Sequence, residues 1–136
     1  MGMLNKGLFS SASVHWATPI ETYNALDAEF HFNDDPCPLY SIGDGLNREW
    51  GSRTFINPSY GREIGKWLKK AYEESLNGAT VVCLIPSRTD TRWWHDYVMK
   101  ASEIRFLKGR LKFGDAKQGA PFPSAIVIFN DNQRVK

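Results

Sequence analysis

The sequence has few of the residues that build metal sites, disulfide networks or membrane anchors. Only two cysteines occur among 136 residues, and the spacing of Cys37 and Cys83 matches no metal or redox motif. The histidines His15, His31 and His95 are scattered, so we expect no metal site. No apolar run approaches the ~20 residues of a membrane helix. The first 13 residues also lack the layout of a signal peptide, so we expect a cytoplasmic protein.

Strong charge of either sign is also absent, since the formal net charge is only +2. Its distribution is uneven: residues 1–50 hold two basic and seven acidic side chains, whereas residues 86–117 hold eight basic and four acidic ones. This pattern suits either ordinary solvated surface or two faces with different ligands, one cationic and one anionic. The length predicts one domain over residues 1–136, with 1–13 as a flexible leader.

The second half of the chain alternates between strand and helix patterns. We predict strands at 54–57, 79–85, 104–107 and 124–129, and helices at 62–76 and 91–101. This alternation predicts an α/β sheet with right-handed crossovers and parallel strands at its centre. The last strand should run antiparallel, because no helix separates it from the strand before it. In such sheets, ligands bind at the carboxyl ends of the strands.

The first half gives weaker signals. Residues 20–30 have a helical pattern, and residues 32–35 suit a short strand that runs into Pro36. Fewer than twenty residues, rich in Gly, Asp and Pro, separate that strand from the next, so a full strand–helix–strand unit does not fit there. A glycine-rich cofactor-binding loop is also missing.

The tetrad Asn57-Pro58-Ser59-Tyr60 lies between a predicted strand and a predicted helix. It is compatible with a simple turn, because Asn-Pro is a common turn starter. It also suits chemistry on an aromatic amine, whose lone pair is delocalised into the ring. The Asn57 side-chain oxygen and the Pro58 carbonyl could accept hydrogen bonds from both N–H groups of that amine. Tyr60 could stack on an extruded base.

Seven stretches of the chain resemble one family in the same order. They are WATP (16–19), FNDDPC (32–37), DGL (44–46) with Trp50, FINPSY (55–60) with Trp67, LIPSRTDTRWW (84–94), FLKGRLKF (106–113) and APFPS (120–124). Together they resemble the phage-type (Dam family) DNA N6-adenine methyltransferases. The resemblance implies a reduced Rossmann-like sheet and transfer of a methyl group from S-adenosylmethionine to N6 of a flipped adenine in double-stranded DNA. It also implies a phage or prophage protein that modifies DNA in a bacterial host cell.

By this resemblance, the catalytic residues are Asn57, Pro58, Ser59 and Tyr60, although the family usually has proline where Ser59 stands. The carboxylates of Asp35 and Asp44 would suit the sulfonium, ammonium and ribose groups of S-adenosylmethionine, although Asp44-Gly45 is also an ordinary turn sequence. The Asp-Pro-Cys turn would replace the missing glycine-rich loop. The predicted cofactor-binding residues are Trp16, Thr18, Pro19, Asp35, Pro36, Cys37 and Asp44. Trp16 would equally suit a core or lid position.

Basic residues follow the second and third predicted strands and could neutralise DNA phosphates. The candidates are Arg88, Thr89, Arg92, Lys108, Arg110 and Lys112. The last three occupy alternate positions, so they could line one face. Each of them alone would also suit solvated surface. Three other functions remain open: methylation of RNA bases or protein glutamine, DNA binding without catalysis, and a purely structural domain.

Overall fold

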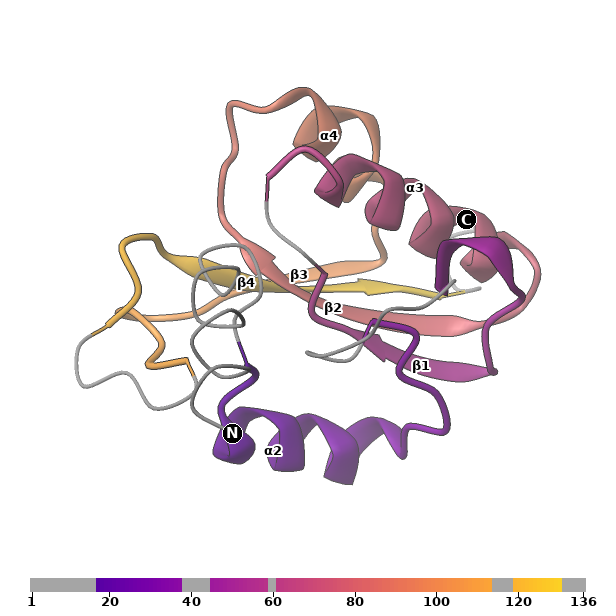
Figure 1. The fold of residues 1–136 in the computed structure, drawn as a ribbon, viewed down its shortest axis with the longest axis horizontal. Coiled ribbons are helices and arrows are strands. Elements are labelled where there is room, and N and C mark those ends of the chain that lie inside the picture. Colours follow the sequence, from indigo (N-terminus) through magenta and orange to yellow (C-terminus); the bar gives the residue numbers. More distant parts are fainter. Residues whose placement is uncertain (1–16, 38–44, 59–60, 114–118, 131–136) are drawn as a thin grey trace, which may run out of the picture.

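A computed structural model describes residues 17–37, 45–58, 61–113 and 119–130 of the chain. Its elements combine helices with a mixed sheet, and Figure 1 shows their arrangement. In chain order they are α2 (Ile20–Phe30), η1 (Gly45–Asn47), β1 (Arg53–Ile56), α3 (Ile64–Leu76), β2 (Thr80–Pro86), α4 (Arg92–Asp96), η2 (Val98–Lys100), β3 (Glu103–Phe106) and β4 (Ser124–Phe129).

The four strands form one sheet in the order β1-β2-β4-β3. β1 pairs in parallel with β2, as predicted, with Ile56 opposite Cys83. β4 pairs antiparallel with both β2 and β3, which confirms the predicted direction of the last strand. β1, β2 and β3 therefore end at one edge of the sheet, where β4 begins. We call this the carboxyl edge.

The expectation of parallel strands at the centre was wrong, because β4 lies between β2 and β3. All six residues of β4, Ser124–Phe129, are buried, whereas β3 carries the exposed residues Glu103 and Phe106. A strand that is apolar on both faces is stabilised most where both faces are covered, which is the middle of the sheet. The long connection between β3 and β4 allows β4 to enter there.

Helices cover both faces of the sheet (Figure 1). α3 and α4 lie on one face, where Ile56, Leu68 and Trp94 belong to one apolar cluster, the α3-side core. α2 lies on the other face, where Leu26, Phe55 and other residues form a second cluster, the α2-side core. The second cluster also contains Phe113, Ala120 and Phe122, which lie in the β3–β4 connection.

Most of the predicted elements form, with shifted ends. α2 has the predicted bounds, α3 begins two residues later than predicted, and each of β1, β2 and β3 is shifted by one residue. The predicted helix at 91–101 is divided into α4 and η2, because the chain leaves helical geometry at Tyr97, where φ is −124°. This break lets the next residue, Val98, enter the α3-side core.

The predicted strand at 32–35 forms only one isolated parallel bridge, between Asp34 and Thr54. The side chains of this segment explain why pairing stops there. Asn33 Oδ1 accepts from the N–H of Arg53, and Asp34 accepts from the N–H of Gly51, so side chains take the place of a regular ladder. The segment still runs parallel to β1 and carries the next residues toward the carboxyl edge.

Candidate active site

Four segments that follow strands or run beside them reach the carboxyl edge. Asn57 and Pro58 follow β1, the loop at 87–91 follows β2, and residues 107–113 follow β3. Residues 35–37 run beside β1 toward the same edge. Most of the site residues predicted from sequence, although spread over the chain, therefore lie at one end of the sheet (Figure 1). This is where open α/β sheets bind ligands.

The side chain of Asn57 is held by the segment that precedes α2. Its Nδ2 donates a 2.9 Å hydrogen bond to Oγ1 of Thr18. The bond fixes the rotation of the amide, so the acceptor oxygen Oδ1, which is also buried, faces away from Thr18. Pro58 is buried next to it, and Pro19 is half-buried just before α2. A predicted catalytic residue and a predicted cofactor residue are thus in direct contact.

The neighbouring acids Asp34 and Asp35 have different roles. Asp34 accepts two hydrogen bonds of 2.8 Å from the guanidinium of Arg48 and a third from the N–H of Gly51. These bonds, that from Arg48 above all, hold the pKa of Asp34 below its usual value. Its carboxylate therefore ties the segment to the loop before β1, which is a structural role.

Asp35 lies in a different environment from Asp34. Solvent reaches its side chain, yet the surrounding protein removes part of its hydration. This desolvation is the main reason that the pKa of Asp35 is raised, and repulsion by Asp34 adds to it, while a hydrogen bond from the Cys37 backbone acts in the opposite direction. A cation beside Asp35 would relieve the cost of its charge.

Gly45 determines how closely the following loop approaches residues 35–37. A side-chain carbon at Gly45 would collide with the carbonyl oxygen of Pro36 and would lie 2.8 Å from the ring of Trp67. The carbonyl of Gly45 accepts a 2.7 Å bond from the indole N–H of Trp50, whose ring stacks on Trp67. Gly45 is therefore required by close packing. Pro36 and Cys37 are both buried beside it.

Two of the predicted DNA-binding arginines contact the β3–β4 connection. The guanidinium of Arg88 lies 5.9 Å from the ring centroid of Phe122, and that of Arg110 donates to the carbonyl of Ala120 at 3.4 Å. Phe122 in turn packs on Phe113, with 5.9 Å between ring centroids. Arg88 is thus held near the carboxyl edge by an aromatic ring, and Arg110 by a backbone carbonyl.

Thr89, Arg92, Lys108 and Lys112 are also exposed, and no regular strand supports the alternation expected for Lys108, Arg110 and Lys112. β3 ends at Phe106, so Lys108, Arg110 and Lys112 lie in irregular chain, and Gly109 between them has φ of +75°. Their side chains therefore do not share a face through strand geometry.

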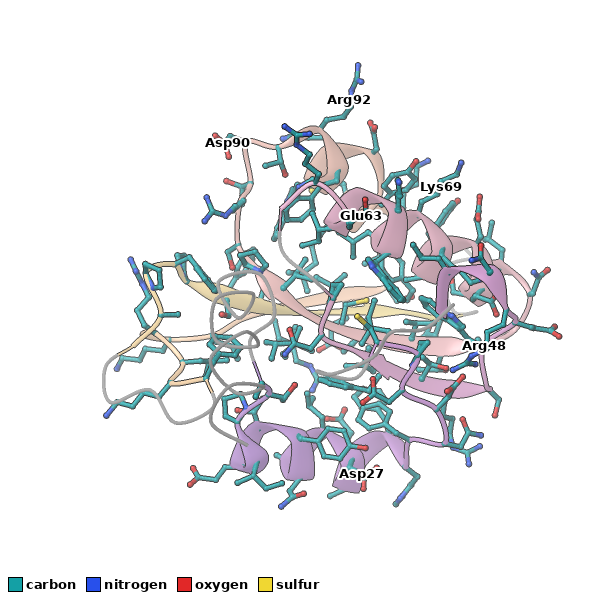
Figure 2. The ribbon with its side chains drawn as sticks, viewed as in Figure 1. Asp27, Arg48, Glu63, Lys69, Asp90 and Arg92 are labelled. Carbon is teal, nitrogen blue, oxygen red and sulfur yellow. The ribbon has the colours of Figure 1, made fainter. Side chains whose placement is uncertain are left out.

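The loop after β2 holds Thr89 but directs Arg92 elsewhere. The Thr89 carbonyl lies 2.8 Å from Nε2 of His95, and the Thr91 hydroxyl caps α4 by accepting from the N–H of Trp94. Figure 2 shows Arg92 pointing outward from α4, away from the sheet. Arg92 is thus the predicted DNA-binding residue whose direction departs most clearly from the carboxyl edge.

Four predicted site residues lie outside the described residues. They are Trp16, Asp44, Ser59 and Tyr60. Sequence reasoning also gave no role to two buried hydroxyl groups at this edge, those of Ser87 and Ser124. Neither forms a hydrogen bond in the structure. A single serine at a strand end carries no sequence signal that separates it from a structural serine.

The described part of the chain contains no group of three or more His, Cys, Asp or Glu side chains arranged to hold a metal ion. None of its helices is both long and apolar enough to cross a membrane.

Comparison with known proteins identifies the family. No curated protein matches the chain in sequence. A family model described as DNA N-6-adenine-methyltransferase (Dam) matches residues 8–133, which is nearly the whole chain. This match includes every candidate residue described above, and it agrees with the resemblance carried by the seven sequence stretches. The chain belongs to the DNA N-6-adenine-methyltransferase (Dam) family.

Proposed function

We propose that this protein is a site-specific enzyme that methylates N6 of an adenine flipped out of double-stranded DNA, with S-adenosylmethionine as methyl donor. Beyond family membership, the observation that carries this proposal is the orientation of Asn57. Its amide nitrogen donates to Thr18 at the carboxyl edge, which orients the amide, and its oxygen is the kind of atom that accepts from an amine. We further infer that the sheet is a reduced form of the Rossmann-like methyltransferase sheet.

The role of Asn57 and Pro58 follows from the chemistry of the amine. An exocyclic amine is a poor nucleophile until its lone pair leaves conjugation with the ring. Two acceptors, Asn57 Oδ1 and the Pro58 carbonyl, would hold both N–H groups and favour tetrahedral geometry at nitrogen. Proline has a fixed φ, which holds its carbonyl in place. By the resemblance, Ser59 completes the tetrad and Tyr60 stacks on the flipped base.

The residues beside Asp35 fit the proposed cofactor. S-adenosylmethionine supplies an activated methyl group on a sulfonium and also carries an ammonium group. Asp35 is an accessible carboxylate, and its raised pKa shows that its negative charge is destabilised by its surroundings. A cationic ligand beside it would stabilise that charge. Pro36 and Cys37 would form the adjacent wall, and Trp16, Thr18, Pro19 and Asp44 would complete the site by the resemblance.

The same edge would receive DNA. Arg88 and Arg110 are supported by the β3–β4 connection, and Lys108 and Lys112 are exposed on it. Cations at these positions suit contacts to phosphates, which position a duplex without reading its sequence. Thr89 belongs to the loop beside them and would extend this surface, whereas Arg92 points away from the sheet (Figure 2). Base-specific readout would come from the same loops.

The direct test is methyl transfer from isotopically labelled cofactor to unmethylated double-stranded DNA, with RNA and protein substrates in parallel. Digestion of the DNA to nucleosides should yield N6-methyladenine, and mapping should place it within one short sequence. Label in RNA or in protein glutamine alone would show that the substrate class is wrong. DNA binding without label transfer would show that the protein is not an enzyme.

A further inference from the structure

Ser124 carries a polar atom whose burial nothing in the described part of the chain explains. It is the first residue of β4, it is 1% exposed, and its Oγ forms no hydrogen bond. Buried hydroxyl groups nearly always form a hydrogen bond, because an unpaired one loses its hydrogen bonds to water and gains none in the protein. An unpaired hydroxyl at the ligand-binding edge of a sheet is therefore a candidate for a ligand contact.

The sheet register places Ser124 on the same face as Asn57. Ser124 alternates with Ile126 and Ile128, both of which belong to the α2-side core. Asn57 alternates with Phe55, which belongs to the same core. The bond from Asn57 to Thr18, just before α2, agrees with this assignment. The two polar side chains therefore share the α2 side of the sheet.

Their separation follows from the pairing of the strands. Ser124 lies opposite Pro86, and continuing the β1–β2 register places Asn57 beside Leu84. Ser124 is thus two strands away from Asn57 and two residues further toward the carboxyl edge. Strand spacing and rise per residue then put the two Cα atoms about 12 Å apart. This is comparable with one heteroaromatic base plus a hydrogen bond at each end.

We propose that Ser124 Oγ donates a hydrogen bond to a ring nitrogen of the target adenine, whose amine is held by Asn57, and so helps select adenine as substrate. The inference rests on the proposed function and deepens it. A hydroxyl can donate to an in-plane nitrogen acceptor, and the burial of Ser124 keeps water from competing. Ser87 is the second unpaired hydroxyl, but alternation from Ile85 places it on the opposite face, so it is not part of this contact.

The test is a double-mutant cycle that combines Ser124→Ala with single-atom changes in the target adenine. The parent protein and Ser124→Ala are assayed on DNA whose target adenine is intact or replaced by 1-deaza-, 3-deaza- or 7-deazaadenine. Ser124→Ala should lower kcat/KM on intact DNA by about 10–100-fold. One analogue should slow the parent protein by a similar factor and slow Ser124→Ala no further, because both changes remove the same bond.

Independent losses with all three analogues would overturn the proposal while leaving the proposed function in place. A parent protein that methylates no DNA would instead overturn both, so the two failures are distinguishable. Unchanged kcat/KM for Ser124→Ala would also overturn the proposal.

Ser75→Ala is the matched control for stability. Ser75 is equally buried, but its Oγ donates to the carbonyl of Tyr72 at 2.7 Å. Ser75→Ala should lower Tm and leave kcat/KM unchanged. Ser124→Ala should leave Tm unchanged or raise it, because the hydroxyl it removes is unpaired. A fall in Tm as large as that of Ser75→Ala would show that the Ser124 hydroxyl has a structural partner, which contradicts the proposal.

Discussion

Asn57 and Thr18 are 39 positions apart in sequence and are joined by a 2.9 Å hydrogen bond from Nδ2 to Oγ1. The bond connects the end of β1 to the segment that precedes α2, and these two segments are far apart in the sequence. It selects one of the two orientations of the Asn57 amide, because only the nitrogen can donate to Thr18 when the hydroxyl accepts. The first prediction depends on that selection.

Asn57→Ala should lower the methylation rate by about 10²–10³-fold, because it removes a positioned acceptor that acts most strongly in the transition state. Cofactor binding, followed by calorimetry, should be retained. Thr18→Val should also reduce kcat, but by a smaller factor, since the amide keeps its chemistry and loses only its orientation. Near-full activity of Asn57→Ala would mean that the tetrad is only a turn.

Asp34→Asn and Asp35→Asn should change stability in opposite directions. The pKa of Asp34 is lowered, so its contribution is present above its unfolded pKa and is lost as pH falls through the folded value. Asp34→Asn should therefore destabilise the protein at neutral pH, by about 1–3 kcal/mol. The pKa of Asp35 is raised, so its ionised form opposes folding at neutral pH. Asp35→Asn should raise Tm, as measured by thermal denaturation without ligand.

Asp35→Asn should also weaken binding of S-adenosylmethionine, whereas Asp34→Asn should affect binding less. In the parent protein, affinity should fall as acid protonates Asp35, and this loss should begin at a higher pH than for an ordinary aspartate. Titration calorimetry at several pH values measures both effects. Equal affinity in Asp35→Asn and the parent protein would remove Asp35 from the cofactor site.

Gly45→Ala should destabilise the protein by about 1–3 kcal/mol, because the added carbon collides with the Pro36 carbonyl and the Trp67 ring. Denaturant unfolding measures the change. Gly65→Ala in α3 is the matched control, since its added carbon would meet Trp93 at an ordinary 3.5 Å and alanine favours helix. It should be neutral or slightly stabilising. A loss in Gly65→Ala equal to that in Gly45→Ala would contradict the packing argument.

Replacing the three exposed cations after β3 with glutamine should weaken DNA binding and its dependence on salt. The change removes Lys108, Arg110 and Lys112 together. Each lost phosphate contact should reduce the slope of log K against log salt by about 1. Lys69→Gln on α3 is the control, because Lys69 is exposed and lies above α3, on the side away from the sheet (Figure 2). An equal effect from Lys69→Gln would mean that the charge effect is nonspecific.

The sequence by itself determined the type of each main element and the family. Periodicity of apolar residues depends on local geometry, so α2, α3 and the four strands could be predicted with ends within one or two residues. The motifs also indicated the candidate residues, since Asn-Pro before an aromatic ring reflects the chemistry required. The direction of β4 followed from the absence of a helix before it.

Only the tertiary structure decided which strands are neighbours and which polar groups are already paired. β4 enters the middle of the sheet because burial on both faces stabilises it most there, and no local pattern encodes that order. Asp34 and Asp35 are adjacent and chemically identical, yet Arg48, fourteen positions from Asp34, binds the first and lowers its pKa, while burial raises the pKa of the second. Ser124 is distinguished only by the lack of a partner. Such differences arise from contacts between distant segments, which exist only in the folded chain.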